Sequence, residues 1–144
     1  MKLLLDTHTF IWWDSQSSQI PADVLDLLKS SDHELLLSLV SVWEIQIKSH
    51  LGKLDLREPL LDIVQRQESQ NRVVILPITL GHIIELDQLP WHHKDPFDRL
   101  LIAQSRIESA MLVSKDTAFD QYDCQRLWQQ TVVGDNGFQD SQEA

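Results

Sequence analysis

Short apolar runs alternate with longer stretches of helical spacing along most of the chain. The run Leu3–Leu5 is closed by Asp6, and an unbroken apolar run of this length is typical of a strand buried on both faces of a sheet. Similar runs occur at residues 35–38, 73–76 and 111–114, and a weaker one occurs at 125–128. The runs predict four strands, the first two of them buried, and one possible edge strand.

Helical patterns fill the segments between these runs. The clearest is the stripe formed by Val40, Trp43, Ile47 and Leu51, which Gly52 ends in the manner of a helix C-terminus. The dipeptide Asp95-Pro96 is a strong helix start, with Asp as N-cap and Pro at the first helical position. Other helices are predicted at residues 7–13, 21–28, 59–70 and 79–86, with a turn and short helix at 115–122.

This alternation predicts an α/β fold with a mainly parallel central sheet of four or five strands flanked by helices. A chain of 144 residues fits one domain, which we expect to span residues 1–133, followed by a polar and flexible tail at 134–144. In parallel sheets, ligands bind outside the carboxyl ends of the strands. Asp6 and Asp116 follow the first and fourth predicted strands, so we expect both to face one crevice.

Composition and charge narrow the class of protein. A hydrophobic fraction of 42% with few Gly and Pro indicates a globular chain. No stretch is long and apolar enough for a signal peptide or a membrane helix, so we expect a soluble, cytoplasmic protein with no membrane partner. The net charge of −10 opposes loose binding to nucleic acid, which normally needs clustered Lys and Arg. Bound divalent metal would weaken that objection.

Four acidic residues are candidates for a shared site. Each has a local explanation: Asp6 and Asp116 could cap helices, Glu44 could pair with Lys48 four residues on, and Asp98 would favour the first turn of its helix. If the four converge, their repulsion calls for cations, and Mg²⁺ or Mn²⁺ prefers carboxylate and water oxygens. One or two such ions could activate water against a phosphodiester.

Four segments stand out as a set: LLLDTHTFIWW at 3–13, SVWEIQIKSHLGKL at 41–54, HHKDPFDRLLIAQS at 92–105 and LVSKDTAFDQY at 112–122. Together they resemble PIN-domain proteins, and most closely the VapC-type toxin ribonucleases of type II toxin–antitoxin systems. They occur in the family's order, and the resemblance covers residues 1 to about 130. The DPFDRLLIAQ stretch is its most specific part.

The resemblance implies a single PIN-like nuclease domain that cleaves RNA endonucleolytically, with a metal-activated water as nucleophile. It matches Asp6, Glu44, Asp98 and Asp116 to the acidic site of the family. Asp6, Asp98 and Asp116 would hold Mg²⁺ or Mn²⁺ directly, and Glu44 would act through water or a second ion. Asp95 is interpreted as a helix cap alone.

Further residues near these acids receive auxiliary roles. Ser114 lies two positions before Asp116, where the family often has a hydroxyl, and Asp120 could be an outer acid. The basic residues within four positions of a proposed ligand are candidates for contacting the RNA backbone, with a solvated surface charge as the alternative: Lys48, Lys94, Arg99 and Lys115. His92-His93 lacks the spacing of a zinc site, so zinc is not expected.

By the same resemblance, the partners are an RNA substrate, a cognate antitoxin protein that blocks the acidic site, and a second copy in a homodimer. A basic antitoxin residue placed near the carboxylates would mimic the charge of the metal. A phosphatase of the haloacid dehalogenase type would need Asp two positions after Asp6, where His8 stands. A phospho-receiver would need adjacent acids near the first strand, and the sequence has none there. A catalytically degenerate PIN domain that only binds RNA or protein stays an open alternative.

Overall fold

The structure is a computed structural model that describes residues 1–129. The predicted end of the domain at residue 133 and the predicted tail at 134–144 lie outside the described residues. The elements, in chain order, are β1 (Lys2–Leu5), α1 (Thr7–Ser15), η1 (Ser17–Gln19), α2 (Ala22–Lys29), β2 (Glu34–Ser38), α3 (Leu39–His50), α4 (Leu60–Asn71), β3 (Val74–Leu76), α5 (Leu80–Glu85), η2 (Leu86–Gln88), α6 (Pro96–Glu108), β4 (Met111–Val113), η3 (Thr117–Gln121) and β5 (Arg126–Leu127).

The five strands form one parallel sheet with the order β3-β2-β1-β4-β5. In the centre of the sheet, Leu4 of β1 pairs with Leu36 of β2 on one side and with Leu112 of β4 on the other. The strand order reverses direction between β1 and β4, and open parallel sheets place ligands outside the carboxyl ends of strands at such a point. The predicted α/β class and parallel sheet are confirmed.

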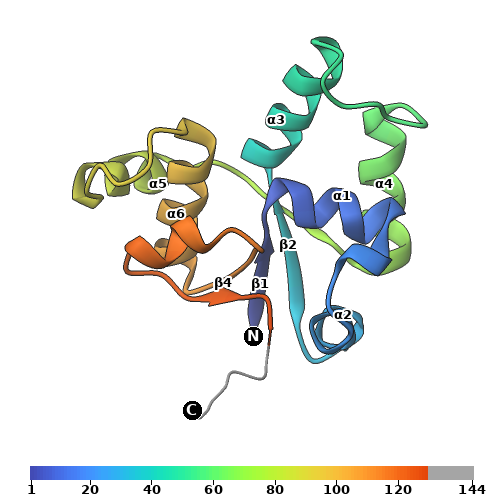
Figure 1. The fold of residues 1–144 in the computed structure, drawn as a ribbon, viewed down its shortest axis with the longest axis horizontal. Coiled ribbons are helices and arrows are strands. Elements are labelled where there is room, and N and C mark those ends of the chain that lie inside the picture. Colours follow the sequence, from blue (N-terminus) through green and yellow to red (C-terminus); the bar gives the residue numbers. More distant parts are fainter. Residues whose placement is uncertain (130–144) are drawn as a thin grey trace.

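Two hydrophobic layers cover the two faces of the sheet. Leu3 and Leu5 pack with residues from α1, α2 and α4, whereas Leu4 packs with residues from α6, η2 and η3. Figure 1 shows the same division, with α1, α2 and α4 on one side of the sheet and α5 and α6 on the other. Because successive strand residues point to opposite faces, β1 is buried on both, as its apolar run predicts.

Helix α3 forms where its apolar stripe predicts, but of the four stripe residues only Val40 is buried. Its fully buried positions include Ser41, Glu44 and Ile45, whereas Trp43 is 58% exposed and Leu51 is 61% exposed. The reason is that α3 packs between α1 and α6 beyond the end of the sheet, so these two helices decide which side is covered. None of the described helices combines the length and the apolar character needed to cross a bilayer.

Candidate active site

Asp6 lies directly after β1, at the carboxyl end of the central strand. It is the N-cap of α1, and its Oδ1 accepts a hydrogen bond of 2.8 Å from the Thr9 N–H. Burial raises the pKa of its carboxyl, and hydrogen bonds from Ser114 and Thr9 partly oppose that rise. The capping explanation is therefore confirmed, and it coexists with a position at the switch point of the sheet.

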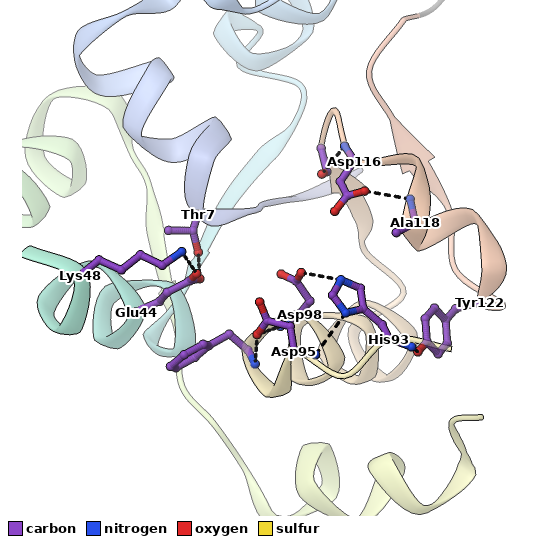
Figure 2. A network of polar contacts seen from close by, with 11 residues as sticks. Thr7, Glu44, Lys48, His93, Asp95, Asp98, Asp116, Ala118 and Tyr122 are labelled. Carbon is purple, nitrogen blue, oxygen red and sulfur yellow. Dashed lines mark hydrogen bonds and ion pairs between the residues drawn. The ribbon is translucent and has the colours of Figure 1, made fainter. Parts of the chain in front are cut away.

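Glu44 is buried on α3 and is held at both oxygens. The Thr7 hydroxyl donates to Oε1 at 2.6 Å, and the Lys48 ammonium lies 2.6 Å from Oε2 (Figure 2). This hydrogen bond is the main cause that raises the pKa of Lys48. The predicted pairing of Glu44 with Lys48 is thus confirmed, and Thr7 adds a tie between α3 and the first residue of α1.

Asp98 occupies the first turn of α6, and burial and the other acids raise the pKa of its carboxyl. Its pKa is raised to about 7, by burial most of all and then by the negative charges of Asp95, Glu44, Asp6 and Asp116 in that order. The carboxylates of Asp98 and Asp116 are turned toward one another in Figure 2. The charge effects on Asp98 show that the four predicted acids converge at one end of the sheet.

Asp116 follows β4 and caps η3, accepting from the Ala118 N–H at 2.9 Å. Its own N–H donates to the Ser114 hydroxyl at 3.0 Å. Asp116 also lines a hollow of about 250 Å³ whose other lining residues are Asp6, His8, Trp12 and Lys115. The acids that follow β1 and β4 therefore face one crevice, as the sequence predicts.

His93 is a neighbour of the acids that sequence reasoning missed. Its Nε2 lies 3.0 Å from Asp98 Oδ2, and one ligand atom each of His93, Asp98 and Asp116 lies within 4.8 Å of the other two. The spacing of the His92-His93 pair bears only on zinc binding. The signal that could have found His93 is its place in the loop directly before the helix that carries Asp98.

The auxiliary residues are placed differently from one another. Ser114 is fully buried, and its hydroxyl joins Asp6 to the Asp116 backbone, so both of its bonding partners are protein groups. Asp120 is held by Arg126 in two hydrogen bonds of 2.8 and 2.9 Å, which lower its pKa. Lys115 is exposed at the hollow beside Asp6.

Two of the basic candidates differ sharply in access. Lys94 is exposed in the loop before α6. Arg99 is only 4% exposed: its guanidinium donates to the carbonyls of Pro90 and Leu89 at 2.8 and 3.4 Å and lies 3.8 Å from the centre of the Trp91 ring. This side chain fixes the preceding loop, and its burial speaks against the predicted contact of Arg99 with RNA.

The donor set at this end of the sheet fits a hard divalent cation. Several carboxylates meet around the partly buried Asp98, and their repulsion adds to burial, the larger cause, in raising its pKa. Carboxylate oxygens are the ligands that Mg²⁺ and Mn²⁺ prefer, and a cation at this place would remove the repulsion. The arrangement can therefore hold a cation that keeps open positions for water.

Comparison with known families and structures gives a consistent result. A family model described as PIN domain matches residues 3–124. Among solved structures, a chain of VapBC2 from Rickettsia felis bound to a promoter DNA fragment has a TM-score of 0.68 and 16% identity, covering 88% of this chain and 98% of that one. A chain of VapBC-1 from nontypeable Haemophilus influenzae has a TM-score of 0.65 and 19% identity, covering 88% and 97%.

A third similar structure is that of DNA-bound VapBC from Salmonella typhimurium, with a TM-score of 0.62, 18% identity and coverage of 88% and 96%. At such identities the likeness is one of fold. Comparison with curated protein sequences finds no significant match.

Proposed function

The chain belongs to the PIN domain family, and from that premise we propose that it is the toxin of a type II toxin–antitoxin system, a Mg²⁺- or Mn²⁺-dependent endoribonuclease of the cytoplasm. The observation that carries the proposal is the gathering of Asp6, Glu44 and Asp116 around the partly buried Asp98, whose pKa is raised to about 7 by burial first and then by the charges of Asp95 and these three acids. Carboxylates brought together against their repulsion are typical of a cation site.

In this proposal Asp6, Asp98 and Asp116 hold the cation, and Glu44 acts through water or a second ion. When bound, the cation supplies charge neutralisation at the phosphodiester and lowers the pKa of an attacking water. The chain's own contribution is orientation: α1, α6 and η3 each begin at or beside one of these acids, so three helix starts fix three carboxylates.

Three lysines near the acids remain candidates for the RNA backbone. Lys115 lies at the hollow beside Asp6, Lys94 is exposed before α6, and Lys48 is part-exposed while it pairs with Glu44. These local cations, together with bound metal, offset the net charge of −10 where RNA would approach.

The partner in this proposal is an antitoxin, and fold likeness supports it because the similar chains come from structures named as VapBC. We expect the antitoxin to bring a basic side chain to the acids, since a cation there would satisfy the carboxylates as a metal ion does. A homodimer is the other expected assembly, and α5 offers an exposed apolar face for it at Leu80, Ile83 and Ile84.

The test is a cleavage assay on the purified full-length chain with transfer, ribosomal and messenger RNA, in Mg²⁺, Mn²⁺ or chelator. We expect cleavage only with the divalent ions. Asp6→Asn and Asp98→Asn should each lower the rate by about 100-fold or more, because several kcal/mol of transition-state stabilisation depend on the cation. Asp87→Asn, which changes an exposed acid on η2, is the matched control and should cleave normally.

Two outcomes would contradict the proposal in different ways. Full activity of the Asp6 and Asp98 variants would contradict the assignment of these residues to the active site. Failure to cleave any of the RNAs with either ion, while RNA or protein binding persists, would favour the degenerate PIN domain that acts as a binding module.

A further inference from the structure

The function proposed above assigns no role to His93, although this side chain touches the central acid. His93 lies in the loop between η2 and α6, and its Nε2 is 3.0 Å from Asp98 Oδ2. Its Nδ1 accepts a hydrogen bond of 3.1 Å from the Asp95 N–H. Both ring nitrogens are therefore engaged, one by a carboxylate and one by a backbone donor (Figure 2).

These two contacts decide where the proton of the neutral ring lies. A ring nitrogen that accepts an N–H bond has its lone pair in use and carries no hydrogen. In the neutral imidazole the other nitrogen must then be the donor. Nε2 thus carries the hydrogen and donates a hydrogen bond to Asp98, whose carboxylate can only accept one when it is ionised.

The same assignment separates His93 from the ligands of a cation. A metal ion binds an imidazole nitrogen through its lone pair, and a protonated Nε2 has none to offer. Metal-binding histidines normally donate a hydrogen bond from the other ring nitrogen, whereas Nδ1 of His93 accepts one. Of the three groups that approach within 4.8 Å, only the carboxylates of Asp98 and Asp116 remain as ligands.

We propose that His93 is a positioning residue of the cation site: its Nε2–H holds one oxygen of Asp98 and leaves the other for the metal, which His93 itself does not bind. Asp98 sits in the first turn of α6 among four other acids whose charges repel it. The repulsion favours rotation of the Asp98 carboxylate away from the other acids. A hydrogen bond from the fixed Nε2–H of His93 to one of its oxygens opposes that rotation. The inference rests on the proposed function only for the identity of the ligand as a divalent cation.

The donor is itself fixed by contacts that do not depend on Asp98. The backbone N–H of His93 donates to the Tyr122 hydroxyl at 2.6 Å, and the Tyr122 ring meets the His92 ring edge-on at 5.4 Å. Asp95, which donates to the His93 ring, also caps α6 through its carboxylate. One residue therefore sets both the start of the helix that bears Asp98 and the orientation of the ring that holds it.

The first experiment reads the hydrogen position directly. Protein labelled with ¹⁵N-histidine is examined by long-range ¹H–¹⁵N correlation without metal and then with ¹¹³Cd²⁺, and His93→Gln identifies the signals. We expect Nε2 to carry the hydrogen in both states and to show no coupling to cadmium. A hydrogen on Nδ1 in the metal-free protein, or ¹¹³Cd–¹⁵N coupling at His93, would overturn the proposal.

The second experiment measures cation affinity rather than activity, by electron paramagnetic resonance of free Mn²⁺. His93→Leu removes the donor and should weaken Mn²⁺ binding by about 10–100-fold, as is usual when a partner of a metal ligand is lost. His93→Gln places an amide N–H near the position of Nε2 and should recover affinity to within a few-fold. His50→Gln is the matched control, since His50 is exposed at the C-terminal end of α3.

The outcomes separate this proposal from the proposed function. Mn²⁺ affinity of His93→Leu equal to that of the unchanged protein would overturn the positioning role. Failure of the unchanged protein to bind Mn²⁺ would overturn the cation site, and the metal-free spectrum would still decide the bond from His93 to Asp98. If His93→Leu fails to fold by circular dichroism, the spectra of the unchanged protein and the Gln variant decide the question.

Discussion

The ionisation of Asp98 depends on residues that are distant in sequence. Asp98 has a pKa of about 7 in the fold, raised first by burial and then by its acidic neighbours. An unfolded chain would protonate this group only near pH 3.9. The folded protein therefore binds the proton more tightly, and this group's contribution to the free energy of unfolding falls as pH rises from about 4 to 7, then stays constant.

Asp98→Asn should abolish this fall in the free energy of unfolding with rising pH. We expect the variant, free of metal, to gain about 1–3 kcal/mol in free energy of unfolding relative to the unchanged chain at pH 8, and less at pH 5, as measured by urea unfolding. Mg²⁺ should stabilise the unchanged chain at pH 8 and not the variant. Asp87→Asn serves as control. A variant that is equally destabilised at both pH values would contradict the assigned pKa.

The residues of the site were predictable from sequence to different degrees, because some positions follow from the neighbouring sequence and others depend on contacts that form only in the fold. Asp6 and Asp116 each follow an apolar strand, so the local sequence predicts where they lie. The burial of Arg99 depends on the carbonyls of Pro90 and Leu89 and on Trp91, which come together only when the loop before α6 closes. The contact of His93 with Asp98 depends on the same loop, so spacing alone could not reveal it.

At the scale of elements, the start of α6 connects helix capping with the electrostatics of the site. Asp95 accepts hydrogen bonds from the N–H groups of Phe97 and Asp98 at 2.9 and 3.4 Å. Its negative charge also raises the pKa of Asp98, second only to burial. The cap that stabilises the helix therefore destabilises the ionised form of the acid one turn away.

Two substitutions separate these effects. Asp95→Asn keeps a good cap and removes the charge, whereas Asp95→Ala removes both. We expect the Ala variant alone to lose about 1 kcal/mol of unfolding free energy in urea. Both variants should lower the pKa of Asp98, measured by titration of its ¹³C-labelled carboxyl. Equal destabilisation by Asn and Ala would contradict the capping role, and an unchanged pKa would contradict the charge effect.

The elements themselves were largely predictable because parallel strands buried on both faces leave a plain signal of three or four consecutive apolar residues. The covered face of α3 was not predictable in this way. Its apolar stripe includes Trp43 and Leu51, which are exposed, whereas the polar Ser41 and Glu44 are buried between α1 and α6. The burial of a hydroxyl and a carboxylate beside Val40 and Ile45 departs from the ordinary pattern of an amphipathic helix.

At the scale of the whole molecule, the exposed face of α5 bears on the expected homodimer. Leu80 is 76% exposed and Ile84 is 56% exposed, and their spacing of four residues places them on one face of the helix. Exposed apolar residues grouped on one element are typical of a protein interface. Stable interfaces bury about 800 Å² on each partner, so α5 would be the centre of a larger contact.

The combined substitution Leu80→Ser and Ile84→Ser should convert a dimer into a monomer. Light scattering coupled to size-exclusion chromatography would show this as a halved mass at micromolar concentration. Leu61→Ser is the matched control, because Leu61 is 64% exposed on α4, which covers the opposite side of the sheet. A monomeric unchanged chain, or a variant that stays dimeric, would contradict the use of this face.

The strand order also fixes when during synthesis the site can exist. β1 is made before the other strands, yet one of its two neighbours in the sheet is β4, which begins more than a hundred residues later. A chain still growing on the ribosome has Asp6 and Glu44 but neither β4 nor Asp116 until residues 111–116 have been made. In a protein that cleaves RNA, this topology would delay the hazard to the translating machinery, and it would give a co-translated inhibitor time to accumulate before the first active site closes.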